Sequence, residues 1–269
     1  MTNPHGSFIW YELMTSDAKA AGDFYGAVVG GWTFGEPMPG PVDYRAIQRS
    51  DGGNAGGVLQ LDDSMRSKGA RPAWLGYIGV DDLDAEVAAV ERDGGKTMMP
   101  PWDVPGIGRL AMVADPQGAP FYLMKPTPPP GQEGKSSDVF SYDQAEHVRW
   151  NELATTDCDG AVDFYTRHYG WRQEGDMDMG EMGKYRFIHQ GGGMIGAIMR
   201  KPPQMPASSW SFYIGVDDID RAATAVKAGS GQVLMGPHQI PGGEYSLNGI
   251  DPQGASFGLV GPRRQGENK

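Results

Sequence analysis

The sequence predicts an α+β protein made by tandem duplication, with two βαβββ modules in each copy. The main observation is the stretch WYELMTSD at residues 10–17, which recurs as WNELATTD at residues 150–157. Both stretches continue in one register into an Ala, an Asp and a Phe-Tyr pair, at residues 21–25 and 161–165. A second observation is that strand patterns alternate with single helix patterns inside each copy. Any function must therefore be considered for two similar domains.

The first copy shows the order strand, helix, three strands, and then the same series again. A strand is expected at residues 7–15, and Asp17 (or Ser16) is then a good N-cap for a helix that ends at Gly30. Asp81 and Asp82 begin a second helix, and residues 62–71 form a polar connection before it. The other strands are expected from residue 32 and at residues 44–49, 57–61, 74–80, 97–99, 108–114 and 120–124.

The second copy repeats this plan. YIGVDD at residues 77–82 returns at 213–218, and DPQGA at residues 115–119 returns at 251–255. The Pro-rich stretch between the copies is typical of a linker, and the charged end is typical of a disordered tail. We expect a first domain at residues 7–126, a linker at 127–146, a second domain at 147–262 and a disordered tail at 263–269.

The composition argues against several classes of partner. A net charge of −11 disfavours nucleic acid and anionic membranes. No apolar run approaches the roughly 20 residues that span a bilayer, and the first residues lack the pattern of a secretory signal. Cys158 is the only cysteine, so an internal disulfide is impossible, which fits a reducing compartment. We expect a cytoplasmic protein, monomeric or homodimeric.

These motifs resemble the vicinal oxygen chelate superfamily, which includes glyoxalase I, bleomycin-resistance proteins and extradiol dioxygenases. The resemblance rests on Phe-Tyr followed by Gly-Trp at residues 24–32, and on Asp-Pro-Gln-Gly at residues 115–118, each present twice. The opening stretch looks like that of two-domain, glyoxalase-like bacterial proteins. The resemblance implies tandem glyoxalase-like domains, in which paired βαβββ modules curl around a cavity. Enzymes of the family hold a divalent metal there as a Lewis acid.

At the positions where the family carries its metal ligands, this sequence has other residues. The family's ligands are usually His, Glu or Gln from the first and last strands of the modules. The corresponding positions here are Trp10, Leu75, Tyr122, Trp150, Ser211 and Gly258. Hard divalent cations need several converging oxygen or nitrogen donors, so we expect no metal cofactor. A non-standard metal site, with Glu12 or Glu152 and either Gln60 or His189, is the alternative.

Strand alternation predicts instead an aromatic cavity with one carboxylate in each domain. Trp10 and Glu12 share the face where the first ligand would lie, as do Trp150 and Glu152 in the second copy. Such walls suit a flat organic ligand, with Glu as hydrogen-bond acceptor or catalytic base. The predicted ligand-binding residues are Trp10, Glu12, Tyr77, Tyr122, Trp150, Glu152, Ser211 and Tyr213.

An alternative interpretation gives the two glutamates a structural role. The pair Tyr44-Arg45 recurs as Tyr185-Arg186, so each arginine could neutralise the glutamate of its own copy. A carboxylate in a buried ion pair of this kind stabilises the fold and binds no ligand. The residue pattern alone leaves both interpretations open.

Other candidate residues carry less information. The histidines do not occupy matching places in both copies, but His189 lies on a predicted strand and could reach the second cavity. Cys158 follows a helix N-cap, where the helix dipole can lower the pKa of a thiol. It has no recognisable partner base, so we interpret it as structural.

Three classes of function follow from these observations. The leading hypothesis is a metal-free protein that binds an aromatic or drug-like small molecule, as bleomycin-resistance relatives do. The second is a glyoxalase-like lyase or a dioxygenase, with a non-standard metal site or with Glu12 or Glu152 as general base. The third is an interaction protein that uses the fold as a scaffold.

Overall fold

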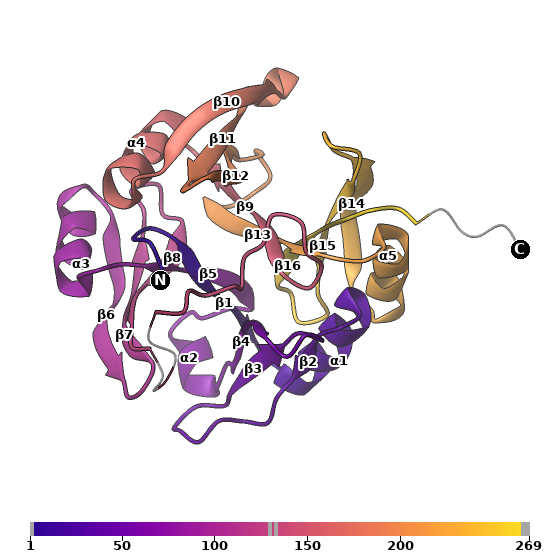
Figure 1. Ribbon diagram of the computed structural model, residues 1–269, viewed down its shortest axis with the longest axis horizontal. Coiled ribbons are helices and arrows are strands. Elements are labelled where there is room, and N and C mark those ends of the chain that lie inside the picture. The colour runs from indigo at the N-terminus through magenta and orange to yellow at the C-terminus, as the bar shows by residue number, and fades with distance from the viewer. Residues whose placement is uncertain (1–2, 129–130, 132–133, 265–269) are drawn as a thin grey trace, which may run out of the picture. The chain divides into compact units, whose positions relative to one another are not determined.

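The computed structural model describes residues 3–128, 131 and 134–264 (Figure 1). Part of the predicted linker (129–130 and 132–133) and most of the predicted disordered tail (265–269) lie outside the described residues. The chain forms two compact units. Unit 1 contains the described parts of residues 1–10, 75–137 and 150–211, and unit 2 those of residues 11–74, 138–149 and 212–269.

The first copy contains eight strands and three helices. They are β1 (Phe8–Thr15), α1 (Ala18–Val29), β2 (Thr33–Phe34), β3 (Tyr44–Gln48), β4 (Asn54–Gln60), α2 (Asp63–Ser67), β5 (Ala73–Gly79), α3 (Leu83–Arg92), β6 (Lys96–Val104), β7 (Gly108–Ala114) and β8 (Pro120–Pro126). The short helix α2 replaces part of the predicted polar connection. Its N-cap Asp62 accepts a hydrogen bond from the backbone N–H of Met65. An Asp at this position is a typical signal for the start of a helix, although residues 62–71 were expected to form only a polar connection.

The second copy repeats the strands of the first, but its described residues form no helix in the place of α2 and form a 3₁₀ turn between β10 and β11. Its elements are β9 (Val148–Thr155), α4 (Cys158–Tyr169), β10 (Arg172–Asp178), η1 (Gly180–Met182), β11 (Lys184–Gln190), β12 (Gly193–Arg200), β13 (Ser209–Gly215), α5 (Ile219–Ala228), β14 (Gln232–Gln239), β15 (Tyr245–Ile250) and β16 (Ser256–Gly261). Among the described helices, none is long and apolar enough to cross a membrane.

Each copy forms one eight-stranded mixed sheet. The strand orders are β2-β3-β4-β1-β5-β8-β7-β6 and β10-β11-β12-β9-β13-β16-β15-β14. In every βαβββ module the first strand pairs in parallel with the last, and the strands between them pair antiparallel. The predicted α+β class and the four predicted modules are therefore confirmed.

The predicted helix caps are present. Asp17, Asp82, Asp157 and Asp218 each stand at the N-cap of a helix and accept a hydrogen bond from a backbone N–H in the first turn. Each such bond stabilises a helix by about 1 kcal/mol. Gly30 ends α1 in the left-handed conformation, with φ of 92°, which favours glycine.

A buried hydrogen-bonded chain joins the modules of unit 1. Trp210 Nε1 donates to Tyr165 Oη (3.1 Å), and Tyr165 Oη donates to Asp115 Oδ2 (3.1 Å). Asp115 Oδ1 accepts from the backbone N–H groups of Gln117 and Ala119. Burial raises the pKa of the Asp115 carboxyl above its ordinary value. Tyr165 lies on α4 and Asp115 follows β7, so the chain links elements from both copies of the repeat.

Unit 2 contains the equivalent chain. Trp74 Nε1 donates to Tyr25 Oη (2.9 Å), which donates to Asp251 Oδ2 (3.1 Å). The helices follow the same plan, since α3 packs on α4 in unit 1 and α1 packs on α5 in unit 2 (Figure 1). The duplicated Phe-Tyr and Asp-Pro-Gln-Gly motifs therefore have a physical role, which is to join a module of one copy to a module of the other.

Candidate functional site

The strongest candidate site lies in unit 1, on β9 and β11. Strand β9 directs Trp150 and Glu152 to one face, and Tyr185 reaches them from β11. Trp150 Nε1 donates a hydrogen bond to Tyr185 Oη (2.7 Å), and Tyr185 Oη donates to Glu152 Oε2 (2.6 Å). The three side chains form one hydrogen-bonded chain that ends on a carboxylate, and we call it the Glu152 chain.

The Glu152 chain contains two aromatic rings, and a third ring, that of Phe187, packs against them. The rings of Trp150 and Tyr185 are nearly parallel, with 6° between their planes and 6.4 Å between their centroids. The ring of Phe187 stands almost perpendicular to both, at 6.3 and 5.9 Å. These rings and Glu152 are only half-buried. The arrangement places a flat apolar surface beside an accessible carboxylate.

Local sequence explains why Tyr185 reaches Glu152. Strand β12 lies between β11 and β9, and its residue Ala197 pairs with Phe187 on one side and Glu152 on the other. The small side chain of Ala197 leaves room for the tyrosine to cross β12. A larger residue at this position would fill the space that the phenol occupies.

The ion-pair interpretation is wrong for the arginines that it named. Arg186 pairs with Asp159 (2.6 Å). Arg45 pairs with Asp43 (2.7 Å), and this bond lowers the pKa of the Asp43 carboxyl. The physical reason is strand alternation, which directs successive residues of β11 to opposite faces. The tyrosine of the repeated Tyr-Arg pair, and not the arginine, therefore meets Glu152.

The first copy holds the corresponding carboxylate in a more closed setting in unit 2. Glu12 is only 2% exposed, and β1 places it beside Gly57 of β4. Tyr44 Oη lies so close to Gly57 that a Cβ atom there would be 2.1 Å from it. A tyrosine and a carboxylate thus recur at the same places in both copies. Glu152 is half-buried, whereas Glu12 is almost fully buried.

Three further aromatic residues pack together in unit 1. Tyr77 and Tyr122 stack at 4.3 Å with 25° between their planes, and Trp102 packs edge-on against Tyr122 at 6.2 Å. Tyr77 and Tyr122 are 5% and 4% exposed. Trp10, on β1, is half-buried. The sequence analysis missed Trp102, because a tryptophan on an edge strand gives no signal of this contact.

The second copy departs from this stack. Gly258 stands where the first copy has Tyr122, and in unit 2 the ring of Tyr213 lies directly on it. Tyr213 Oη accepts a hydrogen bond from Asn248 Nδ2 (2.9 Å). Ser211 is half-buried on β13 of unit 1. That these residues and their first-copy counterparts bind a ligand stays a prediction.

The side chains do not fit a divalent metal. Among the described residues, no group of three or more His, Cys, Asp or Glu side chains converges on a point. The positions that correspond to the family's ligands include Trp150, whose indole N–H is a donor, and the apolar Leu75.

Cys158 and His189 do not extend the Glu152 chain. The position of Cys158 at the start of α4 does not lower the pKa of its thiol, because burial raises that pKa above its ordinary value. His189 is half-buried on β11, and a role for it stays a prediction.

A buried charged cluster in unit 1 escaped the sequence analysis. The side chain of His168, on α4, is 4% exposed and lies between two carboxylates of the α3 segment. Its Nδ1 is 2.8 Å from Glu86 Oε1, and its Nε2 is 2.9 Å from Asp93 Oδ2. Arg167 also pairs with Asp93. The cluster fixes α3 to α4. The repeat gave no sign of it, because the residue of the first copy that corresponds to His168 is Val28, which cannot form an ion pair.

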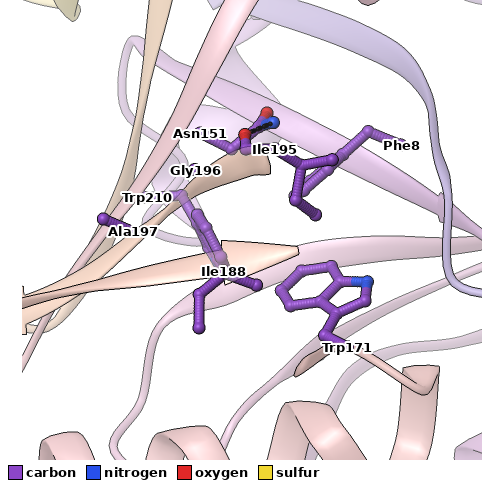
Figure 2. Close-up of a pocket in the computed structure, with 8 residues that line it drawn as sticks. All are labelled: Phe8, Asn151, Trp171, Ile188, Ile195, Gly196, Ala197 and Trp210. Carbon is purple, nitrogen blue, oxygen red and sulfur yellow. Dashed lines mark hydrogen bonds between the residues drawn. The ribbon is translucent and has the colours of Figure 1, made fainter. Parts of the chain in front are cut away.

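The hollow drawn in Figure 2 is part of the core of unit 1 and not a binding site. It is lined by Phe8, Asn151, Trp171, Ile188, Ile195, Gly196, Ala197 and Trp210, and it admits no water-sized molecule. Its single polar side chain is satisfied, because Asn151 Nδ2 donates to the carbonyl oxygen of Ile195 (2.7 Å).

Comparison with known proteins defines the class. The model of the Glyoxalase/Bleomycin resistance protein/Dioxygenase superfamily matches residues 7–123 and 144–258. The chain therefore belongs to this superfamily, as a protein with tandem glyoxalase-like domains.

Individual relatives extend along nearly the whole chain. The protein named "Putative glyoxylase CFP32" of Mycobacterium tuberculosis is 31% identical over 258 residues, which cover 95% of each chain. Anthracycline biosynthesis protein DnrV of Streptomyces peucetius is 28% identical over 275 residues, which cover 95% of this chain and 93% of its own.

Solved structures share the fold at low identity. The Mn(II)-bound glyoxalase from Novosphingobium aromaticivorans has a TM-score of 0.62 and 17% identity, over 97% of this chain and 83% of its own. The 2,2',3-trihydroxybiphenyl 1,2-dioxygenase from Sphingomonas wittichii strain RW1 has a TM-score of 0.65 and 15% identity, over 96% and 90%.

Proposed function

We propose that this protein binds a flat aromatic small molecule against Trp150, Tyr185 and Phe187, with Glu152 as the acceptor for a hydroxyl group of the ligand. The observation that carries the proposal is the Glu152 chain, in which a half-buried carboxylate is held beside aromatic rings by Tyr185 at 2.6 Å. Binding sites for small organic molecules combine apolar and aromatic walls with a few fixed polar groups.

The chemistry of the carboxylate supports a ligand with an O–H donor. An ionised carboxylate has about four lone-pair positions, so a glutamate can accept from a tyrosine and from a ligand hydroxyl at the same time. Tyr185 is itself fixed by Trp150, so the carboxylate is oriented before a ligand arrives. A pre-oriented acceptor loses less conformational freedom on binding.

The relatives support a fused-ring ligand. One relative is named as an anthracycline biosynthesis protein, and anthracyclines are fused-ring aromatic compounds that carry phenolic hydroxyl groups. The nearly parallel rings of Trp150 and Tyr185 suit contact with such a surface.

Titration with hydroxylated anthraquinones tests the proposal. Quenching of tryptophan fluorescence gives the dissociation constant for the wild type, for Glu152→Gln and for Glu181→Gln, a control at an exposed acidic residue of unit 1. A hydrogen bond to a charged group contributes about 1.5–3 kcal/mol, so Glu152→Gln should weaken binding by about 10- to 100-fold. Absence of binding to the wild type, or equal binding by both variants, would refute the proposal.

A second candidate is a lyase-type or dioxygenase-type enzyme in which Glu152 acts as general base. The short bond between Tyr185 Oη and Glu152 Oε2 favours it, because the pair can accept a proton and keep it near the ligand. In this case Glu152 takes a proton from a C–H or O–H group of the bound compound. Incorporation of solvent deuterium into the bound compound, absent in Glu152→Gln, would support the enzyme; binding without exchange would rule out proton abstraction from carbon.

A further inference from the structure

Strand β11 carries a third side chain on the face where Tyr185 and Phe187 lie. The rings of Tyr185 and Phe187 pack together at 5.9 Å, whereas Ile188 points to the other face, where it is 3% exposed and lines the hollow of Figure 2. The pairing with β10 has no shift between Ile188 and His189, and the extra residue of the neighbouring bulge belongs to β12. Strand alternation therefore returns His189 to the face of Tyr185 and Phe187.

The protein supplies no acceptor for the imidazole of His189. Its neighbours in the sheet are Met194 on β12 and Arg172 on β10. A thioether is a weak acceptor, and a guanidinium group only donates. His189 is half-buried, and it makes no hydrogen bond or ion pair with any residue that the structure describes. Its ring N–H is therefore left to solvent or to a ligand on this face.

The sheet register gives the position of His189 relative to Glu152. Glu152, Ala197 and Phe187 lie in one row across β9, β12 and β11. His189 is two residues beyond Phe187, about 7 Å along the strand, and β11 lies two strands from β9, about 10 Å across the sheet. The backbones of His189 and Glu152 are thus about 12 Å apart, and both side chains shorten this gap. A ligand of two or three fused rings that lies over Phe187 can meet both.

The charges beside His189 favour a neutral acceptor. Arg172, directly across from His189 on β10, pairs with Glu174 at 2.6 Å. This ion pair has no net charge, so it gives an anionic group of a ligand no advantage. An imidazole carries at least one N–H donor whether it is neutral or protonated. A carbonyl oxygen is a neutral acceptor that matches this donor.

The first copy has a donor at the same place but lacks the accessible carboxylate. Gln48 corresponds to His189, and the same shift of register stands before it on the strand. Its amide group also offers N–H donors. Glu12, the counterpart of Glu152, is only 2% exposed. Only the second copy therefore combines such a donor with a half-buried carboxylate, and glutamine is the replacement for His189 that keeps a donor.

We propose that His189 donates a hydrogen bond to a carbonyl oxygen of the aromatic ligand, at the end opposite to the hydroxyl group that Glu152 accepts. This inference rests on the proposed function, because it concerns the same site. It narrows the ligand class to hydroxylated aryl ketones and quinones. One end of the site accepts a hydrogen bond and the other end donates one, so His189 determines which aromatic hydroxyl compounds bind best.

Two naphthols that differ in one oxygen atom test this contact. In 6-acetyl-2-naphthol the carbonyl and hydroxyl groups lie at opposite ends of the ring system, and 6-ethyl-2-naphthol lacks the carbonyl oxygen. Calorimetric titration into the full chain at fixed pH gives the dissociation constant of each compound. The carbonyl group should strengthen binding to the wild type by about fivefold, the factor that one neutral hydrogen bond contributes.

Four variants separate this contact from the role of Glu152. His189→Phe should lose the gain from the carbonyl group, and His189→Gln should keep it. His238→Phe, at an exposed histidine of β14, is the matched control and should also keep it. Glu152→Gln should weaken the binding of both naphthols by a similar factor.

The outcomes distinguish the two proposals. If neither naphthol binds the wild type, or if Glu152→Gln binds both as tightly as the wild type does, the proposed function fails and this inference fails with it. If binding depends on Glu152 but the carbonyl group gives no gain in the wild type, or an equal gain in His189→Phe, only the assignment of His189 is overturned.

Discussion

Replacing Tyr165 by phenylalanine tests whether the buried Trp210–Tyr165–Asp115 chain holds unit 1 together. The change removes the bond to the carboxylate, worth about 1.5–3 kcal/mol, and leaves Trp210 Nε1 without its acceptor, which costs about 1–3 kcal/mol. We expect the free energy of unfolding to fall by roughly 3–5 kcal/mol. At about 2–4 °C per kcal/mol, the Tm should fall by roughly 6–20 °C.

Tyr169→Phe provides a matched control on the same helix. Tyr169 is also buried, but its hydroxyl has no hydrogen-bond partner among the described residues. Removing that hydroxyl should change stability by less than about 1 kcal/mol, or increase it, because an unsatisfied buried polar group is lost. Urea unfolding followed by tryptophan fluorescence measures both variants. If Tyr165→Phe loses no more stability than Tyr169→Phe, the chain does not join the modules in the way described.

Three further predictions concern stability. Burial raises the pKa of Asp115 above its ordinary value of 3.8, so the free energy of unfolding should fall as pH rises from about 4 through the folded-state pKa, and Asp115→Asn should flatten that dependence in urea titrations. Gly57→Ala should cost about 1–3 kcal/mol by overpacking against Tyr44, and a double-mutant cycle with Tyr44→Ser should be strongly non-additive. His168→Leu should cost roughly 1–3 kcal/mol in thermal unfolding, because it removes the partner of the half-buried carboxylate of Glu86; a loss below about 0.5 kcal/mol would show that the cluster contributes little.

Local signals predicted most of the fold. Asp17 and Gly30 bound α1 because capping depends on residues within one turn, and sequence shows those residues directly. The repeat then transferred each assignment to the second copy. The pairing of Tyr165 with Asp115 could not be predicted, since the two residues are distant in sequence and only the packing of modules from different copies brings them together.

The candidate site was predicted only in part. Strand alternation correctly placed Trp150 and Glu152 on one face, because the period of two is a local property. The partner of Glu152 was not predicted, because the repeated Tyr44-Arg45 and Tyr185-Arg186 pairs drew attention to the charge and not to the phenol. Phe187, Ala197 and Glu152 lie in one row across the three strands, and Tyr185 shares the face of Phe187 on β11. This register favours Tyr185 over Arg186 as the partner of Glu152.

The dissociation constants of two matched ligands test the central claim most directly. Calorimetric titration of 2,6-dihydroxyanthraquinone, whose hydroxyl groups cannot reach the quinone carbonyls, and of unsubstituted anthraquinone is made into the wild type and into Glu152→Gln. Hydroxylation should strengthen binding to the wild type by about tenfold or more, and this gain should disappear in Glu152→Gln. An equal gain in both proteins would show that the ligand hydroxyl does not meet Glu152, and it would contradict the proposed site.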